Sequence, residues 1–283
     1  MTLDNAQLPI VGNAPVGHAT GSKTDRRDLW WVSPLVTFVV FSAFIVYATW
    51  RTFENDFYRD PDMLAYGWHY LSPFYSPTLG ADLRIGGYSI TPAIWILPFP
   101  LLFRGTCYYY RKAYYRAFFW DPPACAVGEI APRKNYTGER AFPLVLQNLH
   151  RYAFYFAAII MVILWYDALD AFRYTDLSPT THSFGNHFFI GLGSLIMLVN
   201  VIFLTLYTFS CHSWRHLIGG SVDCFSCTSG TKTRHGIWQH VTHLNENHAL
   251  WAWLSLFSVA LTDLYIRSVA SGAITDIHLW PRP

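Results

Sequence analysis

The chain has 283 residues, of which 52% are hydrophobic and 13% are charged. Soluble domains carry about 25% charged residues, so this composition excludes an ordinary soluble protein and predicts an integral membrane protein. The net charge is only +2 and the basic residues are scattered, which argues against a nucleic-acid-binding protein.

Residues 1–28 are polar and Gly-rich, and they lack the apolar core of a cleavable signal peptide, so they predict a cytoplasmic tail. Residues 29–50 carry no charge after Asp28 and predict the first membrane-spanning helix. The second span is expected over about 90–119, as one helix kinked by its prolines that continues through the Tyr-rich stretch.

Three more spans follow, at about 150–172, 186–216 and 248–268. They complete a transmembrane domain over residues 29–275, and residues 276–283 are left as an outer tail. The predicted fold class is therefore all-α, an integral membrane bundle of five transmembrane helices.

Three acidic residues lie near the outer ends of these spans: Asp167, Asp170 and Asp263. They are candidates for a proton path. The favoured interpretation is that they are helix-end residues, paired with neighbours such as Arg173 and Arg267.

The distribution of Lys and Arg predicts the orientation of the bundle. With the N-terminus inside, 14 of the 20 basic residues fall on inner segments and 6 on outer ones. Inner loops of membrane proteins are enriched in positive charge, so we expect a cytoplasmic N-terminus and an outer C-terminus.

Cysteine and histidine gather on the predicted inner side, between the fourth and fifth spans. His212 and His216 stand one helical turn apart, and Cys224 and Cys227 form a Cys-x-x-Cys pair. Two thiolates and two imidazoles are the ligands of a Rieske-type [2Fe-2S] cluster. Four ligands are expected from seven candidates: Cys211, His212, His216, Cys224, Cys227, His240 and His243.

The choice of the four ligands stays open. The spacing favours the two pairs just described, and a mixed set with Cys211 and either His240 or His243 is almost as plausible. Cys107 and Cys125 are expected to be inert, and thiols on the cytoplasmic side are expected to stay reduced.

A haem b is the main alternative to the cluster, with His150, His212 or His248 as its axial ligands. Two haems are not expected, because the first two spans contain no histidine.

A quinone is the expected electron acceptor on the inner side. Five aromatic or cationic residues are placed to bracket its headgroup: Arg151, Tyr152, Trp214, Arg215 and Trp238. An aromatic belt with basic anchors would explain the same residues equally well.

Three segments carry a resemblance to a known family: Leu-His-Arg-Tyr at 149–152, the stretch from Cys211 to Gly220, and the stretch from Asn245 to Arg267. Over about residues 25–275 the chain resembles the membrane-anchor subunit of actinobacterial succinate dehydrogenases, especially the mycobacterial kind. The sequence departs from the five-helix anchor with two haems. That anchor places axial histidines on its first, second, fourth and fifth helices, whereas the first two spans predicted here contain no histidine.

The resemblance implies a multi-pass subunit of succinate:quinone oxidoreductase in the plasma membrane, a part of the respiratory chain and the tricarboxylic acid cycle. Its partners would be a flavoprotein subunit with FAD and the succinate site, an iron–sulfur subunit with further clusters, and further copies of the complex in a higher oligomer. Electrons would pass through this chain to menaquinone.

Two other functions remain open beside electron transfer through a cluster or a haem. One is a structural scaffold whose Cys and His residues bind zinc or nothing. The other is a transporter, which is least favoured because the spans show no inverted repeat and no charge pair at the bilayer centre.

Overall fold

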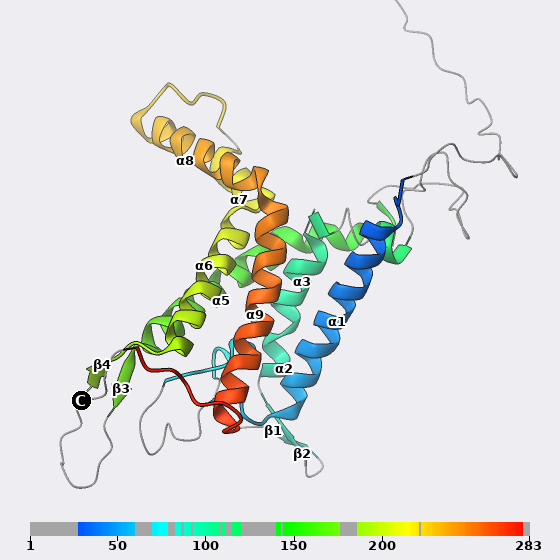
Figure 1. Cartoon of the computed structure of the whole chain (residues 1–283). Coiled ribbons are helices and arrows are strands. Elements are labelled where there is room, and N and C mark those ends of the chain that lie inside the picture. The colour runs from blue at the N-terminus through cyan, green and yellow to red at the C-terminus, as the bar shows by residue number, and fades with distance from the viewer. Residues whose placement is uncertain are drawn as a thin grey trace, which may run out of the picture.

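The computed structural model describes residues 28–59, 69–78, 83–85, 88–91, 93–107, 109–110, 115–119, 140–142, 144–175, 186–220 and 222–279. Within these residues the chain forms a helical bundle, with two short hairpins at one end and a projecting helix at the other (Figure 1).

Four of the described helices are long and apolar enough to cross a membrane. They are α1 (Val32–Glu54), α5 (His150–Asp170), α6 (Leu192–Phe209) and α9 (His248–Ala270). A 3-10 helix, η5 (Leu144–Leu149), runs directly into α5. The all-α fold class is confirmed, whereas five crossings and a cytoplasmic N-terminus remain predictions.

The predicted second span differs most from expectation. It contains two short helices, α2 (Ala93–Ile96) and α3 (Pro98–Thr106), separated by a turn at Leu97. The prediction of one continuous helix to residue 119 is wrong, because the backbone leaves the helical conformation at Cys107, with φ −59° and ψ 135°. A π-helical stretch, η3 (Tyr115–Phe119), follows further along.

The predicted fourth span is broken near its inner end. After α6 the backbone becomes extended at Cys211, with φ −63° and ψ 142°, and a new helix, α7 (His212–Gly219), begins. The Cys211 thiol caps α7 by accepting a hydrogen bond from the Ser213 N–H. This corner points Cys211 into the bundle, where it is buried.

The hairpins pair β1 (Leu83–Ile85) with β2 (Tyr88–Ile90), and β3 (Arg173–Thr175) with β4 (Asn186–Phe188). Both pairs are antiparallel. With three residues in each strand, they close loops between helices and do not form a sheet core.

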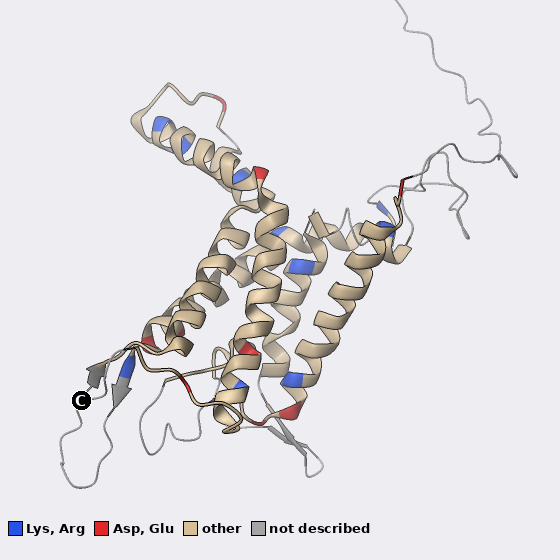
Figure 2. Ribbon diagram, viewed as in Figure 1, with Lys and Arg blue, Asp and Glu red and all other residues tan. Residues whose placement is uncertain are grey.

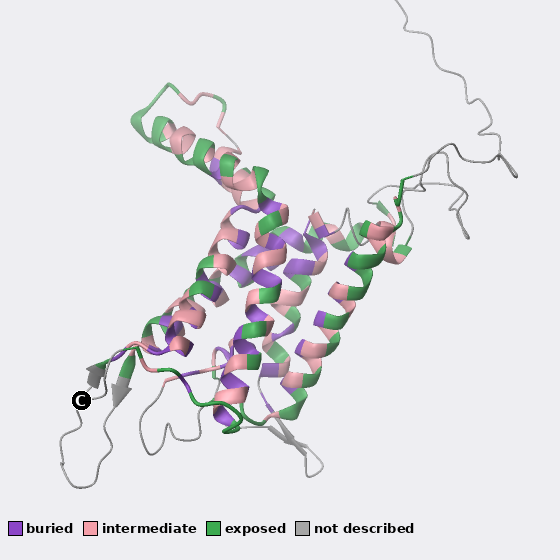
Figure 3. Ribbon diagram, viewed as in Figure 1, coloured by how far each residue is buried: buried purple, intermediate pink, exposed green. Residues whose placement is uncertain are grey.

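The core lies between the helices. α6 packs against α9 and α5, and α3 packs against α5. Figure 3 shows that the buried residues face the interior of the bundle, whereas apolar side chains such as Ile159, Val162 and Leu261 are exposed on its outside. Exposed apolar side chains on long helices are typical of contact with lipid.

The acidic residues at the hairpin end are paired. Arg267 Nε lies 3.0 Å from Asp263, and Arg173 Nη1 lies 3.6 Å from Asp170. Asp167 accepts a hydrogen bond from a serine hydroxyl. The predicted ion pairs of Asp170 and Asp263 are therefore confirmed.

The opposite end of the bundle gathers several helix termini. The start of α1, the end of α3, the starts of α5 and α9, and α7 all lie there, and α8 (Ser229–Glu246) projects beyond them (Figure 1). Figure 2 shows charged residues mainly near helix ends, with one basic residue within α3. This convergence of termini positions the site described next.

Candidate cysteine–histidine centre

Two cysteine–histidine contacts lie buried where the four helix ends meet. Nε2 of His150 lies 3.0 Å from Sγ of Cys211, and Nε2 of His248 lies 3.1 Å from Sγ of Cys107. All four side chains are buried, with exposed fractions between 1% and 8%. The pairs join the end of α3 to the start of α9, and the start of α5 to the corner between α6 and α7.

Hydroxyl groups hold the second nitrogen of each imidazole. Nδ1 of His150 lies 3.0 Å from the Thr106 hydroxyl, and Nδ1 of His248 lies 2.6 Å from the Ser210 hydroxyl. Thr106 precedes Cys107 and Ser210 precedes Cys211, so each hydroxyl–cysteine dipeptide contacts both histidines. The contacts therefore form a closed ring through the four segments, with each Nε2 turned toward sulfur.

Aromatic rings cover both imidazoles in the same way. Phe103 stacks on His150 with a centroid distance of 4.8 Å and an interplanar angle of 9°. Tyr207 stacks on His248 at 5.1 Å and 13°. Such rings exclude water and fix the orientation of the imidazole planes.

The two halves of the ring share a sequence pattern. Residues 103–107 read Phe-Arg-Gly-Thr-Cys and residues 207–211 read Tyr-Thr-Phe-Ser-Cys. Each is an aromatic residue, two variable residues, a hydroxyl residue and a cysteine, and each ends a helix that runs toward the same end of the bundle. Sequence reasoning missed Cys107, and this repeated pattern is the signal that identifies it.

The four residues supply two thiols and two imidazoles as possible metal donors. No group of three or more His, Cys, Asp or Glu in the described part of the chain is arranged to hold one metal ion. Two thiols and two imidazoles are nevertheless the protein ligands of a Rieske-type [2Fe-2S] cluster. Metals bind cysteine as the thiolate, so binding of a metal at Cys211 would displace a proton.

A cavity of about 730 Å³ adjoins the four residues. Its lining includes all four, together with polar side chains that were not predicted. These additional residues are Gln147, Asn148, Asn245 and Glu246. The cavity therefore offers amide and carboxylate groups beside the cysteine–histidine pairs.

The structure does not bring the seven predicted metal ligands together. Of these, Cys211 belongs to the buried ring. His212 and His216 are exposed on α7, with ring centroids 6.1 Å apart. His240 and His243 are exposed on the projecting α8.

Cys224 and Cys227 form a disulfide in the loop that precedes α8. A disulfide has no thiolate to offer to iron, so the expectation that both thiols stay reduced does not match the structure. Cys125 lies outside the described residues.

The predicted haem ligands are divided. His150 and His248 both belong to the buried ring, whereas His212 lines the cavity from α7. Each of the two buried histidines has its Nε2 within about 3 Å of a thiol, so both imidazoles face a cysteine and not each other.

The five predicted quinone residues also fall in different places. Arg151 lines the cavity. Tyr152 is 64% exposed on the outside of α5, and Trp214 stacks on Phe154. Arg215 lies 4.6 Å from the ring of Trp238, so this pair joins α7 to α8.

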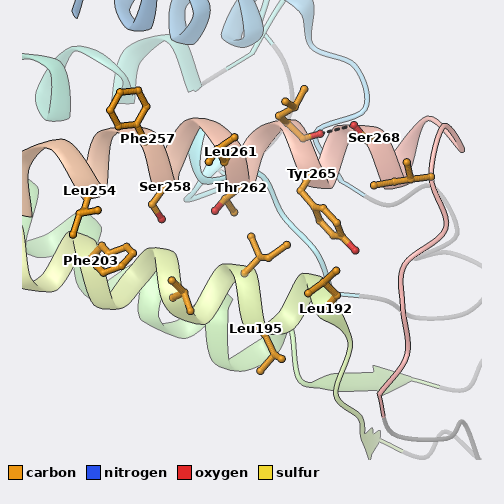
Figure 4. A pocket seen from close by; sticks show the side chains of 14 residues that line it. Leu192, Leu195, Phe203, Leu254, Phe257, Ser258, Leu261, Thr262, Tyr265 and Ser268 are labelled. Carbon is orange, nitrogen blue, oxygen red and sulfur yellow. Dashed lines mark hydrogen bonds between the residues drawn. The ribbon is translucent and has the colours of Figure 1, made fainter. Parts of the chain in front are cut away.

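A second cavity, of about 690 Å³, lies between α6 and α9 (Figure 4). Its lining is mainly apolar, with side chains such as Phe203, Leu254 and Leu261, and it includes no Cys, His or charged residue. The cysteine–histidine centre is therefore the stronger candidate site.

Long apolar helices around a buried cysteine–histidine site define the class: an integral membrane helical bundle with buried thiols and imidazoles at one end. The match to known families is more specific. The chain belongs to the family of actinobacterial succinate dehydrogenase subunits SdhC, whose family model matches residues 32–272. It is thus a membrane subunit of succinate dehydrogenase, the respiratory complex II of the plasma membrane, and its partners are the flavoprotein and iron–sulfur subunits.

A solved structure has a similar chain. A chain of the Mycobacterium smegmatis Sdh1 complex in the apo form is 44% identical, with a TM-score of 0.75. The match covers 91% of this chain and 94% of that one. No curated protein matches this sequence.

Proposed function

We propose that this subunit passes electrons from the iron–sulfur subunit to menaquinone through a Rieske-type [2Fe-2S] cluster of its own. The observation that carries the proposal is the closed ring of Cys107, His150, Cys211 and His248. This set replaces the seven ligands predicted from spacing. Of those seven, Cys211 alone belongs to the ring, where it is buried and contacts His150.

Each residue of the ring has a distinct role in the proposal. The two thiols would hold one iron as thiolates, and the two imidazoles would hold the other. Thr106 and Ser210 orient the imidazoles through Nδ1, so Nε2, which faces a thiol in each pair, would be the nitrogen that binds metal. The cluster would supply a one-electron relay close to the end of the bundle where the helix termini meet.

The adjacent cavity supports the assignment of a quinone acceptor. It is lined by Gln147, Asn148 and Arg151, whose N–H groups can donate hydrogen bonds to quinone carbonyls. The histidines on its wall bring the relay next to the bound headgroup, so no further carrier is needed.

Low-temperature EPR and optical spectra of the purified complex test the proposal. We expect a reduced-state EPR signal with an average g value typical of Rieske centres, and no haem α-band. A haem band without that signal would instead assign His150 and His248 to haem, and the absence of both would leave a scaffold that carries no redox centre.

Single substitutions test the ligand set. Cys107→Ala, Cys211→Ala, His150→Ala and His248→Ala should each abolish the signal and quinone reduction, while succinate oxidation by artificial acceptors persists on the flavoprotein. The matched controls Cys224→Ala and His240→Ala remove the same side chains outside the ring. Loss of the signal in the controls and its survival in the ring variants would refute the assignment.

A further inference from the structure

Arg104 is a buried cation that has no ionic partner among the residues the structure describes. It lies on α3 with 4% of its surface exposed. Its Nη2 donates to the Ser255 hydroxyl at 3.0 Å, and its Nη1 donates to the Ala252 carbonyl at 3.3 Å and approaches the Tyr110 hydroxyl at 3.5 Å. All of these acceptors are neutral, and no carboxylate in the described part of the chain pairs with Arg104.

The other fully buried arginine shows the contrast. Arg267 is also 4% exposed, and it pairs with Asp263 and with Glu54, each at 3.0 Å. Burying a charge is expensive unless a counter-charge compensates it, and a membrane interior makes the cost greater. Among the described residues, no negative charge compensates Arg104.

The neighbours of Arg104 place it close to the proposed redox centre. The guanidinium lies 4.6 Å from the centroid of the Tyr207 ring, and the same ring stacks on His248 at 5.1 Å. Along the chain, the backbone N–H of Cys107 donates to the Arg104 carbonyl at 3.2 Å. The Tyr207 ring thus separates Arg104 from the proposed ligand His248. One helical turn separates Arg104 from the proposed ligand Cys107.

The charge of the proposed centre matches this position. Two ferric ions, two sulfides and two thiolates, with two neutral imidazoles, have a net charge of zero. One electron from the partner subunit makes the centre negative by one unit. A fixed positive charge nearby stabilises the reduced state and so raises the reduction potential.

We propose that Arg104 is the counter-cation of the redox centre, and that its charge sets the potential at which the centre accepts an electron. The inference rests on the proposed function, because it requires the cluster to be present. Arg104 acts through space and through the Tyr207 ring, without binding iron.

The test is an EPR-monitored redox titration of the purified complex. Arg104→Gln removes the charge, and Ser255→Asp neutralises it while Arg104 stays in place. Both should shift the midpoint potential downward with unchanged g values. For a unit charge about 10 Å away at an effective dielectric constant near 20, the equilibrium constant for reduction should fall roughly tenfold.

Arg173→Gln is the matched control, because it removes an arginine that is 59% exposed at the opposite end of the bundle. It should leave the potential unchanged. A wild-type potential in either Arg104→Gln or Ser255→Asp, with the g values intact, would overturn the role of Arg104 and leave the cluster assignment standing. Absence of the EPR signal from the wild-type complex would overturn the cluster assignment and this inference together.

Discussion

Two hydroxyl side chains orient the histidines of the centre. Thr106 and Ser210 each contact Nδ1 of one imidazole, at 3.0 and 2.6 Å. Outer hydrogen-bond partners of this kind typically change metal affinity by about 10- to 100-fold. Thr106→Val and Ser210→Ala should therefore weaken retention of iron, as measured by the iron content that remains after a chelator challenge.

Ser268→Ala provides the control for these variants. Its hydroxyl donates to the Leu264 carbonyl at 2.8 Å near the far end of α9, so iron retention should match the wild type. Equal retention in Thr106→Val, Ser210→Ala and the control would show that the hydroxyls do not support the ligands.

At the residue scale, the sequence predicted metal ligands within one dense run of cysteines and histidines, whereas the contacts in the structure join residues that are far apart in the chain. The dense run from Cys211 to His243 suggested local pairing, as in Cys-x-x-Cys loops. The buried ring instead combines residues 107, 150, 211 and 248, which lie at least 37 positions apart in the sequence and each at a helix end. These contacts join residues that are far apart in the chain, so local spacing does not predict them. The repeated five-residue pattern at 103–107 and 207–211 is the sequence feature that indicates them.

At the scale of elements, the buried pair of Asp263 and Arg267 fixes α9 to the hairpin end of α1. Tyr47 also donates to Asp263 at 2.7 Å, and Arg267 donates to the Arg51 carbonyl at 3.0 Å. Removing one member of a buried pair costs roughly 3–5 kcal/mol, because the other charge remains buried. Asp263→Ala should therefore lower the thermal unfolding midpoint of the purified complex.

Arg173→Gln breaks an exposed ion pair in the same region and should change the free energy of unfolding by no more than about 0.5 kcal/mol. If Asp263→Ala unfolds at the same temperature as this control, the buried network does not hold α9 in place.

Helix prediction succeeded where apolar character is continuous and failed at breaks made by single residues. The helices at 32–54, 150–170 and 248–270 match the predicted spans closely. Cys107 and Cys211 leave the helical conformation within predicted spans. Hydropathy alone does not reveal these breaks, because a buried Cys behaves as a small hydrophobic residue and does not interrupt an apolar stretch.

At the scale of the whole molecule, the centre and α8 lie at one end and the hairpins at the other. The predicted orientation places the centre on the cytoplasmic side, where the soluble partners bind. In a background with Cys125, Cys224 and Cys227 changed to serine, Ala273→Cys at the hairpin end should react with an impermeant maleimide in intact cells. Ser229→Cys, at the start of α8, should react only after lysis.

The buried Cys107 and Cys211 provide an internal control for that experiment, since the parent background should remain unlabelled. Labelling of Ser229→Cys in intact cells, with Ala273→Cys protected, would reverse the orientation.

The ring of contacts also constrains the biogenesis of the subunit. Cys107 and His248, which touch in the finished protein, are separated by 141 positions in the chain. The ligands of the proposed centre therefore cannot assemble until the last helix, α9, has entered the membrane and packed against α6. Iron–sulfur insertion would then serve as a checkpoint for completed membrane integration, and truncated chains that lack α9 would be recognised by their inability to retain iron.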